Sequence, residues 1–387
     1  MRKLLIVTTN KYPGGDAGAI REEAIAKIFN ELMIEVYIVG LGESTGFEWK
    51  KSNDIYYNSL RAFGESKIRR VQNLALYKKR IEGIITDGWG TGFDYIMLSN
   101  VTNGVTRFIK NYCKKRNIKL LHNSVEWYSP EEFKLGVLSP SYQSKKYLNR
   151  NLIDGQFGVI AISGYLDRYF KRRGIKTVRI PAVLDISKYS MSGNRTNEDV
   201  IFSYIGVPGR KDYIAECVAA FALLEEKELS HCELRLVGVD HEELVNTCGA
   251  GMSAIKKLGK HLKCIGRVNH MDAIRQFQKA DYSVFLRDAD LRYAKAGFPT
   301  KFVESMAVGT PVICNLSSDL HLYLRDEENG LVCKACDKYE LVRCIRKALA
   351  LSHDEKNRMN QNARRTAEEH FDYHNYTYAI KELLYNQ

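Results

Sequence analysis

The sequence predicts an α/β protein of two domains, each built around a parallel β-sheet. Short apolar runs alternate with amphipathic stretches along most of the chain, a pattern typical of βα repeats. The chain has 387 residues, which is long for one hydrophobic core and suits two domains of about 150–200 residues each. A stretch from Pro181 to Asn197, polar and turn-forming at its end, separates two such series. We therefore expect an N-terminal domain over 1–188 and a C-terminal domain over 189–370.

The first series begins close to the N-terminus. The apolar run Leu4–Thr8 predicts a strand. Apolar side chains recur at helical spacing from Ile20 to Leu32, which predicts a helix over 21–31. Further strands of this series are expected, in chain order, at 35–39, 95–98, 119–122, 158–162 and 178–180.

The second series begins with an expected strand at Val200–Ile205. The elements expected after it are a helix over 212–224, strands at 233–239 and 262–265, a helix over 270–280 and a strand at 282–286. Two more helices are expected at 354–369 and 373–385.

The excess positive charge of the chain lies in its first half. Residues 1–190 contain 31 Lys and Arg against 18 Asp and Glu, a net charge of +13, whereas the remaining residues carry 27 against 28. Basic clusters attract anionic lipid at about 1 kcal/mol per near-surface charge, but they also bind nucleic acid or merely solubilise helices. No nucleic-acid module is recognisable, so we expect an anionic membrane surface as a partner, with solvated helix faces as the alternative. The clusters lie at 67–70, 78–80, 114–116 and 171–173.

The apolar and cysteine patterns restrict the class of protein further. No stretch approaches the ~20 apolar residues of a membrane-spanning helix, and the N-terminus enters a strand directly, so neither a span nor a signal peptide is expected. The nine cysteines are scattered, and Cys333 and Cys336 form an isolated C-x-x-C. This pattern favours free thiols in a reducing compartment over a metal site. We expect a cytoplasmic protein, peripheral on the inner face of the plasma membrane.

The segment Ala296–Ile313 carries the strongest functional signal. It predicts a loop, a helix over Thr300–Val308, a Gly-Thr-Pro turn and a buried strand. The start of a helix offers unpaired N–H donors and about half a positive charge, which suits a diphosphate. Glu304, one turn further in, has two oxygens with which it could hold sugar hydroxyls. The alternative is an ordinary βα crossover with a solvated glutamate.

This segment resembles the donor-site signature of retaining glycosyltransferases of family 4, which have the GT-B fold. Gly297-Phe298-Pro299, Glu304 and the tail 309–313 match the family pattern, whereas its first glutamate is replaced by Ala296. The resemblance implies two Rossmann-like domains facing each other across a cleft, with the C-terminal helix 371–387 returning to the N-terminal domain. It assigns donor binding to Phe298, Pro299 and Thr300 and the ribose to Glu304. The change to Ala296 leaves the handling of the sugar open.

Two loops of the first half are further candidates. Gly14 and Gly15 follow the first strand, where glycine permits close approach to a ligand, and the resemblance assigns them to the donor phosphates and acceptor. His122 ends another expected strand and could polarise a sugar or share a proton. Glu126 could accept a proton from the acceptor, and Trp127 with Tyr128 could stack on it. The alternative is a capping histidine and aromatic side chains that pack beneath a loop.

The second half supplies further candidates for donor binding. Arg210 and Lys211 precede an expected helix, where a guanidinium and an ammonium suit two phosphates, and the resemblance assigns both to the donor. It also assigns Arg267 and Val268 to the nucleotide base. Arg287 and Arg292 lie in the loop before Ala296, and each is either a diphosphate ligand or an ordinary surface residue.

The resemblance implies a metal-independent hexosyltransferase that moves a sugar from a nucleoside diphosphate sugar to a lipid-linked glycan in cell-surface polysaccharide synthesis. No cofactor and no metal are expected, since no Asp-x-Asp triad is placed for one. Two alternatives stay open, a GT-B partner subunit that lost transfer with its first glutamate and a nucleotide-sugar epimerase. The sequence leaves the base, the sugar, the acceptor, the linkage and the oligomeric state undetermined.

Overall fold

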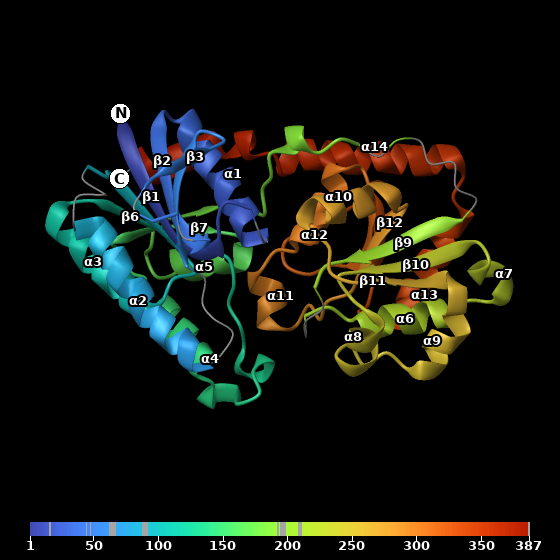
Figure 1. Cartoon of the computed structure of the whole chain (residues 1–387). Helices are drawn as coiled ribbons and strands as arrows, with labels where there is room; N and C mark the ends of the chain where they lie inside the picture. Colours follow the sequence, from blue (N-terminus) through green and yellow to red (C-terminus); the bar gives the residue numbers. More distant parts are fainter. Residues whose placement is uncertain are drawn as a thin grey trace. The chain divides into compact units, whose positions relative to one another are not determined.

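A computed structural model of the chain divides it into two compact units (Figure 1). Unit 1 comprises Met1–Val183 and Tyr373–Gln387, and unit 2 comprises Leu184–Asp372. The first unit therefore ends before the predicted boundary at 188, and the chain returns to it at 373. The structure describes residues 1–14, 17–43, 45–46, 48–61, 67–86, 92–191, 193, 199–207 and 211–385, with only the backbone over 67–75.

Unit 1 contains an eight-stranded sheet with the order β3-β4-β2-β1-β5-β6-β7-β8 in the described residues. Its strands are β1 (Arg2–Lys11), β2 (Ile34–Gly42), β3 (Lys50–Ser52), β4 (Ile55–Arg61), β5 (Tyr95–Ser99), β6 (Lys119–Ser124), β7 (Phe157–Ala161) and β8 (Thr177–Arg179). Strand β3 runs antiparallel to β4, and the other neighbouring pairs run parallel. The order reverses between β1 and β5, which are direct neighbours.

Helices cover both faces of this sheet (Figure 1). They are α1 (Ala17–Glu31), α2 (Lys67–Thr86), α3 (Asn103–Arg116), α4 (Pro140–Tyr147), α5 (Gly164–Lys171) and α15 (Thr377–Tyr385), with short turns η1 (Pro130–Glu132), η2 (Gly136–Leu138), η3 (Leu148–Leu152) and η7 (Tyr373–Tyr376). Helix α15 belongs to the core of unit 1, because Ile380 and Leu384 pack with Ile25 and Ile38. The guanidinium of Arg2 lies over the ring of Tyr385 at 5.0 Å from its centroid.

Unit 2 contains a six-stranded parallel sheet with the order β11-β10-β9-β12-β13-β14 in its described part. The strands are β9 (Val200–Ile205), β10 (Cys232–Val237), β11 (Leu262–Ile265), β12 (Tyr282–Phe285), β13 (Val312–Asn315) and β14 (Gly330–Cys333). Numbered within the unit, this is the order 3-2-1-4-5-6 of a dinucleotide-binding sheet. The central strands β9, β12 and β13 are mostly apolar and buried on both faces, as parallel sheets between helices require.

The helices of unit 2 connect these strands. They are α6 (Ile214–Ala222), α7 (Glu226–Leu229), α8 (His241–Asn246), α9 (Met252–Leu258), α10 (His270–Lys279), α11 (Arg292–Ala296), α12 (Thr300–Ala307), α13 (Lys338–Ala350) and α14 (His353–His370), with turns η4 (Ile186–Lys188), η5 (Gly259–His261) and η6 (Leu320–Leu322). Aromatic rings fill the core, with Phe202 stacked on Tyr282 and edge-on to Phe221. Among the described residues, none of the helices has the length and apolar character needed to span a membrane.

Several of these elements have the bounds that the sequence predicted, and two helices begin later than predicted. The strands at 200–205 and 262–265 have the predicted bounds, and helix α12 begins at the predicted Thr300. The final helix begins later than predicted, because Tyr373–Tyr376 form a 3₁₀ turn before α15. Helix α6 begins at Ile214 rather than 212, because its N-cap residue Tyr213 has non-helical backbone angles, with φ −88° and ψ 64°.

Candidate functional site

Two loops meet at the carboxyl ends of β9 and β12, where the strand order of unit 2 reverses. They are the loop after β9, of which both ends are described, and the loop after β12. In open parallel sheets, ligands bind outside the carboxyl ends of the strands at such a point. Gly206 and Val207 follow β9, and Arg287 follows the end of β12. The amide of Arg287 donates to Asn315 Oδ1 at 2.9 Å, which fixes this loop to the neighbouring β13. These residues therefore frame the candidate site of unit 2.

Helix α12 begins beside this point with Pro299 as its N-cap residue and Thr300 as its first helical residue. Proline suits a helix start because it lacks the N–H that would be unpaired there. The Phe298 ring packs edge-on to Phe302 and Tyr323 and is buried. The side chain of Phe298 is thus part of the core, and only its backbone is available to a donor.

Glu304 lies one turn into α12, and its carboxylate is held by a histidine. His270 Nε2 is 3.0 Å from Glu304 Oε1, and both side chains are partly buried. His270 is the first residue of α10, whose N-cap Asn269 accepts a hydrogen bond from the amide of Asp272. One carboxylate oxygen is therefore fixed by α10. The sequence analysis assigned Glu304 but did not identify His270.

A buried charge cluster lies behind the loop after β9. Asp212 accepts from Lys301 Nζ at 2.7 Å, from Arg287 Nε at 2.8 Å and from the Tyr204 hydroxyl at 2.8 Å. Burial alone would raise the pKa of Asp212, but the charges of Lys301 and Arg287 outweigh it and hold that pKa well below its usual range. Burial lowers the pKa of Lys301, and the charge of Asp212 opposes this effect. The cluster carries two cations and one anion beside the start of α12.

The glycines of these loops are required by close packing. A Cβ on Gly238, which has a φ of +90°, would lie 2.4 Å from the carbonyl oxygen of Gly206. A Cβ on Gly206, with a φ of +148°, would lie 3.1 Å from Lys301 Nζ. The ammonium of Lys301 also lies 3.9 Å from the centroid of the Tyr204 ring. The ammonium of Lys301 therefore packs against both Tyr204 near the end of β9 and Gly206 in the loop after it.

The other predicted donor residues of unit 2 are placed as follows. The carbonyl of Lys211 accepts a hydrogen bond from the Tyr293 hydroxyl, which ties this residue to α11. Arg267 is largely exposed and donates to Glu243 at 3.1 Å, and Val268 is exposed beside it after β11. Arg210 lies outside the described residues. Arg287 is mostly covered and paired with Asp212, so the expectation of an ordinary surface residue is wrong for it.

Ala296, at the position of the missing family glutamate, is the last residue of α11 and is fully buried. No carboxylate can reach a sugar from this position in this chain.

The glycine loop of unit 1 follows β1 at the reversal of strand order in that sheet. Gly14 has a φ of +69° with open space around it, which fits the predicted close approach of a ligand, whereas Gly15 lies outside the described residues. A Cβ on Gly18 would lie 2.6 Å from Asn10 Nδ2. That amide donates to Glu22 at 2.8 Å, and the Thr8 hydroxyl donates to the same oxygen at 2.8 Å. The loop is thus anchored to a buried carboxylate of α1.

His122 lies within β6, which continues to Ser124, and not at the end of the strand as predicted; its side chain is buried between aromatic rings. The centroids of Phe157 and Phe170 lie 6.4 and 6.5 Å from that of its imidazole, both nearly edge-on. Burial, and next the positive charge of Lys145, lower the pKa of His122 to about 3. The imidazole is therefore neutral at physiological pH, and in this structure its ring is packed rather than presented to solvent.

The aromatic residues after β6 divide into a packed one and an accessible one. Trp127 is buried, with its ring centroid 4.5 Å from that of Tyr169, so the packing alternative holds for its side chain. Tyr128 is partly exposed and donates through its hydroxyl to Glu126. The sequence analysis did not single out Lys145 of α4. Burial lowers the pKa of Lys145, and the charge of Glu126 opposes this effect.

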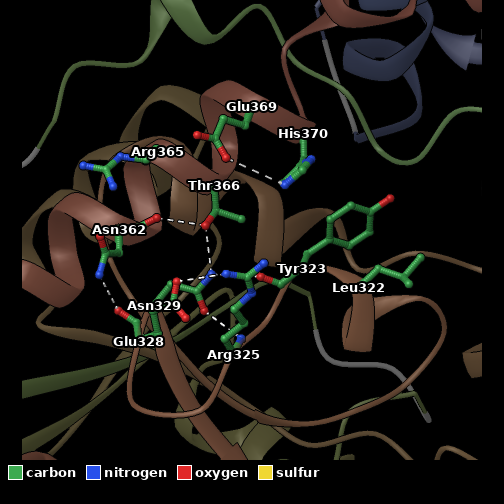
Figure 2. A pocket seen from close by; sticks show the side chains of 10 residues that line it. All are labelled: Leu322, Tyr323, Arg325, Glu328, Asn329, Asn362, Arg365, Thr366, Glu369 and His370. Atoms are coloured by element: carbon green, nitrogen blue, oxygen red, sulfur yellow. Dashed lines mark hydrogen bonds and ion pairs between the residues drawn. The ribbon is translucent and has the colours of Figure 1, made fainter.

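A separate crevice of about 60 Å³ lies in unit 2 between α14 and the segment before β14 (Figure 2). Its buried Asn329 donates to the carbonyl of Tyr323 and to the Thr366 hydroxyl, both at 2.8 Å. The side-chain amide of Asn329 thus has both of its hydrogen-bond partners within the protein, and we assign no ligand to this crevice. Its lining residues are Leu322, Tyr323, Arg325, Glu328, Asn329, Asn362, Arg365, Thr366, Glu369 and His370.

The comparison with protein families identifies the region that carries the site. Residues 185–366 match the family described as glycosyl transferases group 1. This match makes the region similar to that family and covers just under half of the chain. The region contains Asp212, His270, Lys301 and Glu304, so the cluster and the α12 site both belong to it. Among curated proteins, none matches the sequence significantly.

Solved structures resemble the whole chain at low sequence identity. A sucrose-phosphate synthase from Thermosynechococcus elongatus has a TM-score of 0.73 and 18% identity, over 99% of this chain and 98% of that one. HepE of Anabaena, solved with UDP-glucose, has a TM-score of 0.69 and 17% identity over 100% of both chains. WaaG, a glycosyltransferase of lipopolysaccharide biosynthesis, has a TM-score of 0.67 and 13% identity, over 99% and 100%. The two parallel-sheet domains thus have the predicted GT-B fold.

Proposed function

We propose that this chain transfers a sugar from a nucleoside diphosphate sugar to an acceptor hydroxyl. The observation that carries the proposal is Glu304, held by His270 one turn into α12 at the reversal point of the sheet. The similarity of the surrounding region to glycosyl transferases group 1 and the UDP-glucose bound by HepE, which has the same fold, support the proposal.

The donor diphosphate would lie at the start of α12. The helix amides and dipole favour an anion there, and the buried cluster of Asp212, Lys301 and Arg287 adds one net positive charge. Lys211 precedes α6 on the loop after β9 and would add a further cation to the donor site. These groups would stabilise the charge that develops on the departing diphosphate. The free oxygen of Glu304 would hold the ribose hydroxyls.

The reaction would retain the configuration at the anomeric carbon. The acceptor oxygen attacks from the face that the diphosphate leaves, so a new C–O bond forms while the bond to the diphosphate oxygen breaks. The acceptor proton passes to that departing oxygen, which balances the step without an enzymic nucleophile. In the described residues no cluster of three or more His, Cys, Asp or Glu could hold a metal ion. We propose transfer of a hexose without a metal.

The proposed acceptor is a lipid-linked glycan at an anionic membrane surface. The net charge of +13 over residues 1–190 supports this choice, because basic surfaces accumulate at anionic lipid. Glu126 and Tyr128, hydrogen-bonded to each other after β6, are the residues of unit 1 that we assign to the acceptor hydroxyl.

Thermal unfolding with UDP, GDP, ADP and their sugars tests the donor site. A ligand at about 100 times its Kd stabilises by about 2.7 kcal/mol, which is roughly 5–10 °C for a domain of this size. We expect Glu304→Ala to abolish the shift, because the ribose contact is lost. The matched control is Glu226→Ala. Glu226 is exposed and lies in α7, before the amino end of β10, whereas the donor site lies at the carboxyl ends of the strands.

Transfer is then measured with the nucleotide sugar that gives the shift. An unchanged shift in Glu304→Ala would refute the assignment of this residue. Binding without transfer to lipid-linked or soluble acceptors would leave a partner subunit, and exchange of a sugar-ring proton without acceptor would indicate an epimerase.

A further inference from the structure

Three apolar side chains project from a short turn of unit 1, between β6 and α4. Leu135, Val137 and Leu138 are 64%, 55% and 79% exposed. Gly136 between them has a φ of +51°, and a Cβ at that position would meet nothing within 4 Å. The turn therefore stands away from the body of the unit. Single exposed apolar residues are ordinary, but three within four residues mark an interaction surface.

The turn is held in this conformation by its own hydrogen bonds. The amide of Leu138 donates to the carbonyl of Leu135 at 2.9 Å, and Gln143 Nε2 donates to the carbonyl of Val137 at 2.6 Å. Phe133, at the start of the segment, packs against Tyr142 of α4. The exposure is thus built into the fold rather than produced by a loose loop.

Basic side chains lie next to the apolar turn in the sequence and on the helices beyond it. Lys134 is exposed within it, and Lys146 lies on the neighbouring α4. Arg107 of α3 donates to the hydroxyl of Tyr147, whose ring is 40% exposed. The exposed acid beside the turn is Glu131, whereas Glu132 is engaged by the amide of Ser129.

Helix α2 packs against α3 and carries further exposed apolar and basic side chains. Lys78 lies against the start of α3, where a Cβ on Gly104 would be 3.6 Å from its Cδ. The neighbouring Leu76 is 59% exposed, and Lys79 is exposed beside it. Helices α2, α3 and α4 and the turn therefore each carry exposed apolar or basic side chains.

We infer that the 135–138 turn inserts into an anionic lipid bilayer, with Lys134, Lys146 and Arg107 on the headgroups. Apolar side chains that enter the acyl boundary and basic side chains that meet anionic headgroups are the two contributions that hold interfacial segments on a membrane. This inference uses no residue of the donor site. Its failure would therefore be separate from failure of the proposed reaction.

The shape of the surface favours a bilayer over a protein partner. A stable protein interface buries at least about 1,000 Å² with close complementarity. Three side chains on a projecting turn offer much less. A bilayer accepts such a convex apolar tip without shape complementarity.

Flotation of the full chain with liposomes tests this inference. The liposomes are phosphatidylcholine alone or with about 30 mol% phosphatidylglycerol, at roughly 0.15 M salt. The test variant is Leu135→Ser/Val137→Ser/Leu138→Ser. The matched control, in unit 2, is Leu223→Ser/Met271→Ser/Leu322→Ser, which removes three side chains that are 44%, 59% and 44% exposed.

We expect the wild-type chain to float with the anionic liposomes and the test variant to lose at least about 10-fold in partition coefficient. Lys134→Ser/Lys146→Ser should lose roughly 25-fold in partition coefficient on anionic liposomes, since each near-surface charge contributes about fivefold. The unit 2 control should float like wild type. Thermal unfolding with the donor nucleotide shows whether each variant is folded.

Three results would overturn the inference. One is a wild-type chain that floats with neither kind of liposome. Another is an equal loss of partition coefficient in the test variant and in the unit 2 control. The third is a test variant that floats normally but changes sedimentation from dimer to monomer, because the turn would then contact a second copy.

Discussion

Removal of the charge on Asp212 gives the sharpest test of the buried cluster. In Asp212→Asn the ammonium of Lys301 and the guanidinium of Arg287 stay buried without a counter-charge. Breaking a buried ion pair in this way costs about 3–5 kcal/mol. For a domain of 150–250 residues each kcal/mol shifts Tm by about 2–4 °C, so we expect unit 2 to lose roughly 10 °C.

Calorimetry of the full chain measures this loss as a shift of the unit 2 transition. The control is Asp290→Asn, a fully exposed aspartate whose carboxylate lies 3.7 Å from Lys295 Nζ. Its effect should be below ~1 kcal/mol, because exposed pairs contribute little. Adding Lys301→Met to Asp212→Asn should recover at least ~1 kcal/mol, since an uncompensated buried charge is removed.

The acid dependence follows from the lowered pKa of Asp212. A carboxyl whose pKa is lower in the folded state contributes stability above its unfolded pKa of about 3.9, and this is lost as the pH falls toward the folded value. The wild-type chain should therefore lose stability in unit 2 below about pH 4 more steeply than Asp212→Asn. If Asp212→Asn shifts Tm no more than Asp290→Asn, the cluster does not stabilise unit 2 and our reasoning is refuted.

Two further predictions concern single residues. His122 has a folded pKa of about 3, below its unfolded value, so it takes up a proton on unfolding and unit 1 should lose about 2 kcal/mol from pH 7 to 5. Denaturation at several pH values measures how steeply the free energy of unfolding falls between pH 7 and 5. This pH dependence should be weaker in His122→Phe and unchanged in His231→Asn, an exposed control. An unchanged pH dependence in His122→Phe would contradict the assignment of the effect to His122. Gly238→Ala should cost unit 2 more than about 2 kcal/mol, because its Cβ meets the Gly206 backbone at a positive φ. Gly266→Ala, where a Cβ meets nothing within 4 Å, should be nearly neutral in the same calorimetric scan, and equal effects of the two would contradict the packing argument.

The sequence predicted the candidate site where the signal was local. The helix start at Thr300 and the position of Glu304 follow from turn residues and helical spacing within one segment, and the structure places both as expected. His270 was missed because it lies 34 residues away and nothing near it marks it as a partner of Glu304. Trp127 and Phe298 were assigned to ligands, yet both are buried in aromatic packing. An aromatic residue beside a loop does not reveal which side of its ring is covered.

The sequence by itself determined the two βα series, the asymmetric charge and the segment that begins α12, because periodicity, composition and turn chemistry are properties of neighbouring residues. Only the tertiary structure decided that Asp212 pairs with Arg287, 75 residues away, and with Lys301, 89 residues away. Those pairs exist because β9 and β12 are adjacent in the sheet although β10 and β11 separate them in the chain. Strand order is set by how the whole unit buries its apolar faces, and no local pattern encodes it.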